Sequence, residues 1–125
     1  LIERAREQGA KIILVDFHAE ATGEKRAFGY YLDGRVSGVY GTHTHVPTAD
    51  ETVLPNGTGY ITDVGMTGVI HSVLGVKTEI IIAKLKDKLP QRFDLASGDC
   101  KLDCILFEID EKTGKALSVE RVEIM

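Results

Sequence analysis

The sequence has no apolar run long enough to cross a membrane. Its longest apolar stretches, IILV at 12–15 and EIIIA at 79–83, fall far short of the ~20 residues that a transmembrane helix needs. It also lacks a basic excess, because 15 Lys and Arg stand against 19 Asp and Glu, for a formal net charge of −4. A membrane protein and a protein that binds duplex nucleic acid are therefore both disfavoured.

Cysteine is scarce as well. Cys100 and Cys104 are the only two, and they fall in DCKLDCILFEI, which reads as a strand. On an extended chain these positions are ~13 Å apart, too far for a disulfide. We expect two reduced packing thiols and a cytoplasmic location.

Internal repeats, low-complexity tracts and linkers are also absent. A chain of 125 residues with 43% hydrophobic and 27% charged residues has the size and composition of one domain. The first residues, LIERAREQG, already follow a helical pattern with Gly9 as a stop, but without an initial Met or a cap. We therefore expect residues 1–125 to form a single partial domain whose preceding sequence is missing.

The first half of the chain has the rhythm of an α/β sheet. KIILVDF at 11–17 is an apolar run typical of a strand buried on both faces. A helix is predicted over 22–32, ended by Asp33-Gly34, and RVSGVYG at 35–41 predicts a second strand. Strand, helix and strand in this order favour a parallel sheet. The apolar residues of the predicted helix are Ala27, Phe28, Tyr31 and Leu32.

The second half reads differently. A Pro-Asn-Gly turn between residues 51–54 and 59–62 predicts a hairpin. A helix is predicted over 77–89, stopped by Pro90.

Three alternating segments then predict an antiparallel meander at the end of the chain. They are residues 91–96, 100–110 and 116–124, with EKTG at 111–114 as a tight turn.

Three of the four histidines fall where predicted strands give way to loops. His18 directly follows the first strand, and His43 and His45 lie in GTHTH after the second. Ligands of open α/β sheets bind beyond the carboxyl ends of the strands, so we expect the three imidazoles at one edge. On an extended segment residues i and i+2 point the same way, so His43 and His45 can address one metal locus.

Imidazole is a favoured ligand of Zn, Fe and Mn, and its second ring nitrogen needs an acceptor. Asp16, Glu20 and Asp50 are candidates for that acceptor. A lone histidine in a loop is commonly just exposed, and we expect this of His71. The convergence of the other three favours a metal site.

Counting ligands leaves two interpretations open. Three neutral imidazoles can complete a mononuclear zinc site with water in the fourth position. Two hydrolytic metal ions ~3.5–4 Å apart need anionic oxygen donors in addition. Either the site is mononuclear or further ligands lie elsewhere.

Residues 15–68, VDFHAEATGEKRAFGYYLDGRVSGVYGTHTHVPTADETVLPNGTGYITDVGMTG, resemble the C-terminal half of the bacterial YmdB-like metallophosphoesterases. These form a branch of the calcineurin-like superfamily that acts on cyclic nucleotides. The likeness extends over essentially all 125 residues and is densest at DFHAE and GTHTH. It implies half of a metallophosphoesterase sandwich, with helices packed on a mixed β-sheet.

The resemblance also implies roles for individual residues. His18 and His43 would share one ion of a binuclear pair, and His45 would bind the other. ITDVGMTG at 61–68 is expected to line the same edge, with Asp63 as a residue that orients a ligand without binding the metal. The implied cofactors are two divalent or trivalent ions, Fe, Mn or Zn.

The early motifs of the family are missing from this chain. They supply an Asp, a bridging Glu and an Asn as metal ligands, and a histidine near the leaving group. The resemblance therefore implies that the N-terminal half is absent and that the histidine near the leaving group lies there. The full-length protein would hydrolyse a small phosphodiester, a 2′,3′- or 3′,5′-cyclic nucleotide, by a binuclear metal-hydroxide mechanism, and the fragment alone would turn over little.

Two other functions remain open at this point. One is a mononuclear zinc hydrolase complete in 125 residues, and the other is a non-catalytic interaction module. Half of a split sheet should expose strand edges and apolar helix-packing surface, and both favour homo-oligomers.

Overall fold

The computed structural model describes residues 1–125, which form two compact units. The first unit comprises Leu1–Gly65 and Cys104–Val122, and the second comprises Met66–Asp103 and Glu123–Met125. None of the helices has the length and apolar character that a membrane span requires.

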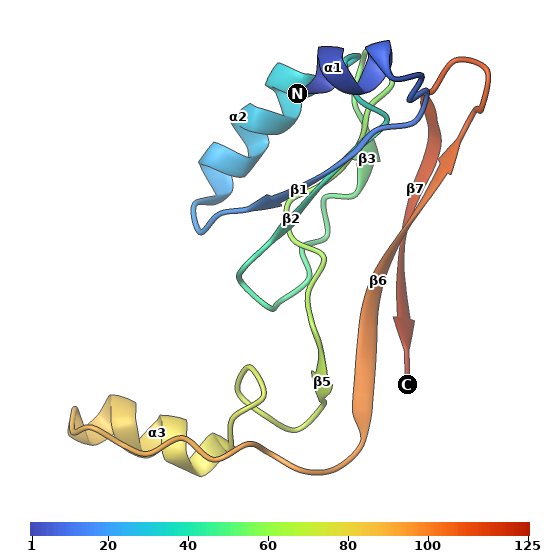
Figure 1. The fold of residues 1–125 in the computed structure, drawn as a ribbon. Coiled ribbons are helices and arrows are strands. Elements are labelled where there is room, and N and C mark those ends of the chain that lie inside the picture. Colours follow the sequence, from blue (N-terminus) through green and yellow to red (C-terminus); the bar gives the residue numbers. More distant parts are fainter. The chain divides into compact units, whose positions relative to one another are not determined.

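A four-stranded sheet organises the first unit, in the order β1-β2-β4-β3; β1, β2 and β3 are labelled in Figure 1. Strands β1 (Leu14–His18), β2 (Gly38–Thr42) and β4 (Gly59–Ile61) are parallel, and β3 (Thr52–Val53) pairs antiparallel with β4. The predicted parallel sheet and the hairpin around Pro-Asn-Gly are confirmed.

Helix α2 (Thr22–Leu32) covers one face of this sheet, but not with the predicted side chains. Its buried residues are Lys25, Gly29 and Leu32. They follow the i, i+4, i+7 spacing of a helical stripe. Gly29 lies against the Tyr60 ring, where an added Cβ would collide. Ala27 is exposed and Tyr31 is 67% exposed, so the predicted apolar face is wrong in these two members, because the helix approaches the sheet over a glycine.

The opposite face of the sheet is covered by the hairpin of β6 (Cys100–Ile109) and β7 (Ala116–Ile124). A Cβ at Gly38 or at Gly59 would meet the Phe107 ring. The two glycines therefore let this ring lie directly on the sheet. A helix on one face and a hairpin on the other make a layered sandwich, which confirms the expected α/β fold with helices packed on a mixed sheet.

The core of the first unit is small. It contains Leu32, Val36, Val39, Leu54 and Tyr60. Ile2 of α1 (Ile2–Glu7) packs against it. Strand β1 lies at the edge of the sheet, and Leu14 is 51% exposed. The prediction of a strand over 11–17 buried on both faces is therefore wrong in its start and in its burial, because β1 begins at Leu14 and every second side chain, on one face, is exposed.

The second unit contains β5 (Thr67–Val69), which pairs antiparallel with the start of β6. It also contains α3 (Thr78–Asp87), which buries no residue. Lys88 ends this helix in the left-handed conformation, at φ 56°. The predicted helix over 77–89 is therefore present, although it ends before Pro90.

The predicted strand over 91–96 is wrong. This segment contributes only an isolated bridge, between Val76 and Leu95. The first residues of β6 are already paired with β5, so β5 occupies the sheet position that the sequence had suggested for 91–96. The antiparallel sheet at the end of the chain has the order β5-β6-β7.

Candidate functional site

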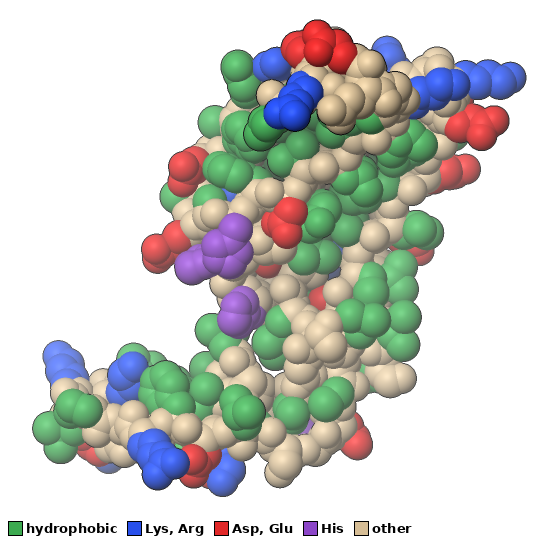
Figure 2. Space-filling model, viewed as in Figure 1, with side chains coloured by type: hydrophobic (Ala, Val, Ile, Leu, Met, Phe, Trp, Pro, Cys, Tyr) green, Lys and Arg blue, Asp and Glu red, His purple; other side chains and the backbone are tan.

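The carboxyl ends of β1 and β2 lie side by side and carry two of the predicted metal ligands. In the parallel register His18 is opposite Thr42, so His43 is the first residue beyond the sheet. Both imidazoles are exposed, and Figure 2 shows histidine side chains, in purple, at the surface. We call these strand ends, with the GTHTH loop, the histidine rim.

A hydrogen-bonded chain sets the tautomer of His18. Nδ1 of His18 lies 3.0 Å from Oγ1 of Thr42, and this hydroxyl donates to Oδ1 of Asp16 at 2.9 Å. The Thr42 hydroxyl donates its only proton to Asp16, so toward His18 the Thr42 oxygen can only accept a hydrogen bond. Nδ1 of His18 is therefore the protonated nitrogen. Nε2 of His18 then carries a lone pair, which accepts a hydrogen bond from Nδ1–H of His43 in this structure. A metal ligand needs the same lone pair. Asp16 therefore fixes the tautomer of His18 through Thr42 and does not contact the imidazole itself.

His18 and His43 meet at this rim. Nε2 of His18 lies 3.1 Å from Nδ1 of His43, with the rings at 84° and their centroids 5.0 Å apart. Two nitrogens each ~2.0–2.1 Å from one tetrahedral or octahedral ion are separated by about 2.9–3.4 Å. The pair thus fits two ligands of one metal ion. No group of three His, Cys, Asp or Glu side chains in the chain is arranged to hold an ion, so the two imidazoles alone do not complete a metal site.

The GTHTH loop departs from extended geometry. His43 has φ 114° and His45 has φ 64°, values that residues other than glycine rarely adopt. The prediction that an extended segment aims both imidazoles the same way is wrong, because the backbone turns at each histidine. His45 is exposed and lies outside the His18–His43 contact. Such backbone conformations cost about 1–3 kcal/mol each and persist where surrounding groups hold them.

Asp63 holds this loop from within the core. Its side chain is fully buried, and Oδ2 accepts from the Thr44 amide at 2.9 Å and from Lys25 Nζ at 2.7 Å. Oδ1 accepts from the Gly65 amide at 3.0 Å. Thr44 lies between the two histidines of the loop, so the carboxylate positions the peptide that joins them. Asp63 thus orients the loop backbone and contacts neither imidazole.

The charge of Asp63 is balanced by a residue that no sequence pattern singled out. Burial raises the pKa of Asp63, but hydrogen bonds from Lys25 and from the Thr44 and Gly65 amides outweigh it and hold the pKa below its ordinary value. Lys25 is only 1% exposed. Lysine is almost never buried unless it is paired. The burial of Lys25 on α2 could therefore not be predicted without knowing that Asp63 lies opposite it.

The other proposed acceptors lie elsewhere. Asp50 accepts from the Thr62 amide at 3.1 Å and from the Thr62 hydroxyl, and it pairs with Arg26 at 3.3 Å. Its prediction as a partner of an imidazole is therefore wrong, because Thr62 and Arg26 occupy both oxygens. Glu20 is exposed and hydrogen-bonds neither imidazole. His71 is exposed in the second unit.

Gly41 allows the loop to begin where it does. An added Cβ there would collide with the Thr62 carbonyl and approach the Lys25 side chain to 2.9 Å. Since the backbone cannot yield as a flexible side chain can, we expect Gly41→Ala to lower the free energy of unfolding by about 1–3 kcal/mol or more. Urea denaturation followed by tyrosine fluorescence measures this change.

Gly23→Ala is the matched control. Gly23 lies in the first turn of α2, and nothing is within 4 Å of its added Cβ. We expect this variant to be as stable as the wild type or about 0.5–1 kcal/mol more stable. Equal stability of the two variants would show that Gly41 is not required by close approach.

The chain is similar to known proteins both in sequence and in fold. Residues 1–122 match the family model described as YmdB-like protein. A 2′,3′-cyclic-nucleotide 2′-phosphodiesterase from Bacillus subtilis (strain 168) is 54% identical over 112 residues, a match that covers 90% of this chain and 42% of that protein.

Two crystal structures have the same fold over 98% of the chain. One is of a hypothetical protein from Thermus thermophilus, with a TM-score of 0.87, 42% identity and 48% of its length covered. The other is of a novel phosphatase from Mycoplasma pneumoniae, with a TM-score of 0.88, 39% identity and 44% of its length covered. The chain spans less than half the length of these relatives. Matched in sequence over residues 1–122, it belongs to the YmdB-like protein family.

Proposed function

We propose that this chain forms part of a metal-dependent phosphodiesterase that acts on 2′,3′- or 3′,5′-cyclic nucleotides with two metal ions. The observation that carries the proposal is the 3.1 Å approach of His18 Nε2 to His43 Nδ1, with Thr42 and Asp16 setting the tautomer of His18. The names of two relatives, a cyclic-nucleotide phosphodiesterase and a phosphatase, support the same chemistry.

In this proposal His18 and His43 hold one ion and His45 holds the other. Fe, Mn or Zn ions bound there would polarise the phosphoryl oxygens and lower the pKa of an attacking water. The imidazoles are neutral when they act as ligands, so they place no negative charge beside an anionic substrate. Anionic oxygen ligands and a histidine near the leaving group would come from sequence that this chain does not contain.

Polar groups beside and beneath the histidine rim keep it in place. Thr42 and Asp16 hold His18 with Nε2 available. The Asp63 carboxylate stabilises the loop, and its charge is balanced by Lys25 at 2.7 Å. The pair is therefore close to neutral as seen from the rim, which suits the approach of a phosphodiester anion.

A chimera tests the proposal. In it, this chain replaces the matched region of the Bacillus subtilis relative, with which it shares 54% identity. We expect the chimera, supplied with Mn²⁺, to hydrolyse 2′,3′-cyclic AMP within about tenfold of the parent rate, a difference of about 1.4 kcal/mol. The isolated 125-residue chain should turn over little.

Two results would contradict the proposal. The first is a folded, metal-loaded chimera that hydrolyses no cyclic nucleotide or linear phosphodiester. The second is an isolated chain that works at the parent rate, because the site would then be complete without further ligands. Metal analysis decides the number of ions: two per chimera fit the binuclear form, and one tightly held zinc would favour the mononuclear hydrolase.

The cytoplasmic location and self-association stay predictions. Leu85 of α3 is 72% exposed and Leu89 is 62% exposed, and β1 and β3 are the edge strands of the first sheet. These are the apolar surface and the strand edges that favour self-association.

A further inference from the structure

A pocket lies at the amino ends of the parallel strands of the first unit. Its lining includes Ile13 directly before β1, Ser37 directly before β2, and Gly57 shortly before β4. The histidine rim lies at the carboxyl ends of the same strands. Since β1 has five residues, the two places are roughly 15 Å apart at ~3.3 Å per residue.

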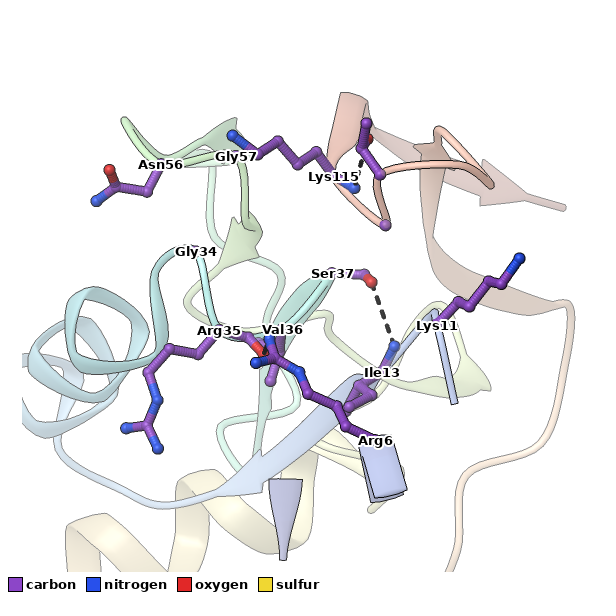
Figure 3. A pocket seen from close by; sticks show the side chains of 12 residues that line it. Arg6, Lys11, Ile13, Gly34, Arg35, Val36, Ser37, Asn56, Gly57 and Lys115 are labelled. Atoms are coloured by element: carbon purple, nitrogen blue, oxygen red, sulfur yellow. Dashed lines mark hydrogen bonds between the residues drawn. The ribbon is translucent and has the colours of Figure 1, made fainter. Parts of the chain in front are cut away.

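The charged side chains that line this pocket are all basic. They are Arg6, Lys11, Arg35 and Lys115. The chain as a whole has a net charge of −4, so the positive charge around this pocket is opposite in sign to that of the whole chain. None of the four forms a salt bridge. The Arg35 guanidinium stacks on Tyr31 at 4.9 Å and points away from Lys11 and Lys115 (Figure 3).

Arg6 and Lys115 border the pocket from different sides (Figure 3). Nη2 of Arg6 donates to the Arg35 carbonyl at 2.7 Å, which fixes the guanidinium and leaves its other N–H groups available. The Lys115 side chain runs along Gly57 (Figure 3), where an added Cβ would come within 2.8 Å of it. Its ammonium has no carboxylate partner. Two cations with unused donors therefore border one pocket.

Ser37 adds a buried donor. It is 2% exposed, and its Oγ accepts from the Ile13 amide at 3.2 Å. The proton of this hydroxyl has no acceptor within the chain. Buried polar groups are normally hydrogen-bonded, so an unused O–H beside unpaired cations points to an acceptor that comes from outside.

Two carboxylates close in the chain to lining residues already accept hydrogen bonds. Asp33 accepts from the amide of Asn56 at 3.0 Å, from its side chain at 3.1 Å and from the Thr58 amide at 3.3 Å. Asp110 accepts from the Lys112 amide at 2.8 Å. Neither forms an ion pair with a lining cation, so neither competes with an incoming anion.

We propose that this pocket binds a tetrahedral oxyanion of phosphate size, at a site separate from the histidine rim. The cavity has a volume of about 70 Å³, far below the ~300–1,000 Å³ of pockets for drug-sized ligands. It therefore takes a single phosphate group. Arg6, Lys115 and Ser37 all donate hydrogen bonds and need no proton on the ligand, so sulfate should bind about as well as phosphate.

Titration of the chain with inorganic phosphate tests this site. Backbone amide NMR spectra are recorded at constant ionic strength with EDTA, so that no metal ion at the histidine rim can hold the anion. We expect saturable shifts of the Ser37, Gly57 and Gly114 amides, with both phosphate and sulfate. Lys115→Gln and Arg6→Gln should each weaken binding about fivefold to tenfold, because a charge-assisted hydrogen bond is lost.

Lys112→Gln is the matched control, because it removes the same charge from the same turn without lining the pocket. Lys115 is exposed and unpaired, so its replacement should leave the spectrum folded even if Arg6→Gln does not. The proposal is overturned if the shifts do not saturate, if they centre on His43, or if Lys112→Gln weakens binding as much as Lys115→Gln. A nucleoside 3′-monophosphate that shifts the same amides at lower concentration would assign the site to phosphomonoesters and so support it.

Discussion

Replacing Asp63 with alanine is expected to lower the free energy of unfolding by about 3–5 kcal/mol, because the Lys25 ammonium would be left unpaired in the interior. The two groups are 0% and 1% exposed and 2.7 Å apart. The change also removes the acceptor of the Thr44 amide, which lies between two histidines of positive φ. We therefore expect the loop to loosen and metal affinity to fall in the same variant.

Urea denaturation followed by tyrosine fluorescence measures the effect. The four tyrosines all lie within residues 30–60, so the signal reports on the first unit alone. This matters because a chain of two units need not unfold in one step.

A double-mutant cycle separates the ion pair from the rest of the site. Lys25→Met removes the charge and keeps the apolar stem, so the double variant with Asp63→Ala should be more stable than the sum of the single changes predicts. Lys77→Met is the matched control, because Lys77 and Asp94 are 3.9 Å apart and 44% and 58% exposed, and such pairs contribute about 0–1 kcal/mol. Additive effects of Lys25→Met and Asp63→Ala would contradict the coupling.

The pH dependence of this stabilisation has a definite sign. The folded state holds the pKa of Asp63 below its ordinary value near 3.8. The contribution is therefore complete above that value and is lost as the pH falls through the lower folded pKa. The stability difference between the wild type and Asp63→Asn should shrink on acidification below about pH 4, and a difference that grows there would show the opposite shift.

Removal of either imidazole of the contact pair is expected to have the second large effect. His18→Ala and His43→Ala should each weaken binding of Mn²⁺ or Zn²⁺ by more than about 100-fold, since loss of a supporting hydrogen bond alone costs about 10–100-fold. The reason is the 3.1 Å separation of Nε2 and Nδ1, which fits the two nitrogens as ligands of one ion in the proposed site. Isothermal titration of the chimera with each metal measures the change.

Two further variants make the measurement specific. Thr42→Val keeps the shape of the side chain and removes the acceptor of His18 Nδ1–H, so we expect an intermediate loss of about 10–100-fold. His71→Ala removes an exposed histidine of the second unit and should leave metal binding unchanged. Equal losses of metal affinity for His71→Ala and His43→Ala would indicate that the metal binds to any exposed histidine. That result would contradict the proposed site.

The histidine rim illustrates how far sequence reasoning reached. Strand-length apolar runs end directly before His18 and shortly before His43, and strand ends are a local property of hydrophobic pattern. The meeting of the two residues was therefore predictable. The geometry within GTHTH was not, because φ values of 114° and 64° are imposed by Asp63, which binds the Thr44 amide from 19 residues away.

The buried face of helix α2 could not be predicted from the hydrophobic pattern. Its length followed from local signals, but its buried stripe runs through Lys25 and Gly29, residues that a hydrophobic pattern does not count. Lys25 is buried because Asp63 lies opposite it, 38 residues later. Gly29 is buried because the Tyr60 ring needs the space of a Cβ.

By itself, then, the sequence determined the order of helices and strands, the parallel sheet, the hairpin around Pro-Asn-Gly and the placement of histidines at strand ends. All of these depend on periodicity and turn chemistry within a few residues. Only the tertiary structure decided which α2 face is buried, how Thr42 sets the His18 tautomer, and that Arg6, Ser37 and Lys115 line one pocket. These depend on contacts between residues far apart in the chain, where electrostatic and steric fit is settled by packing and not by local pattern.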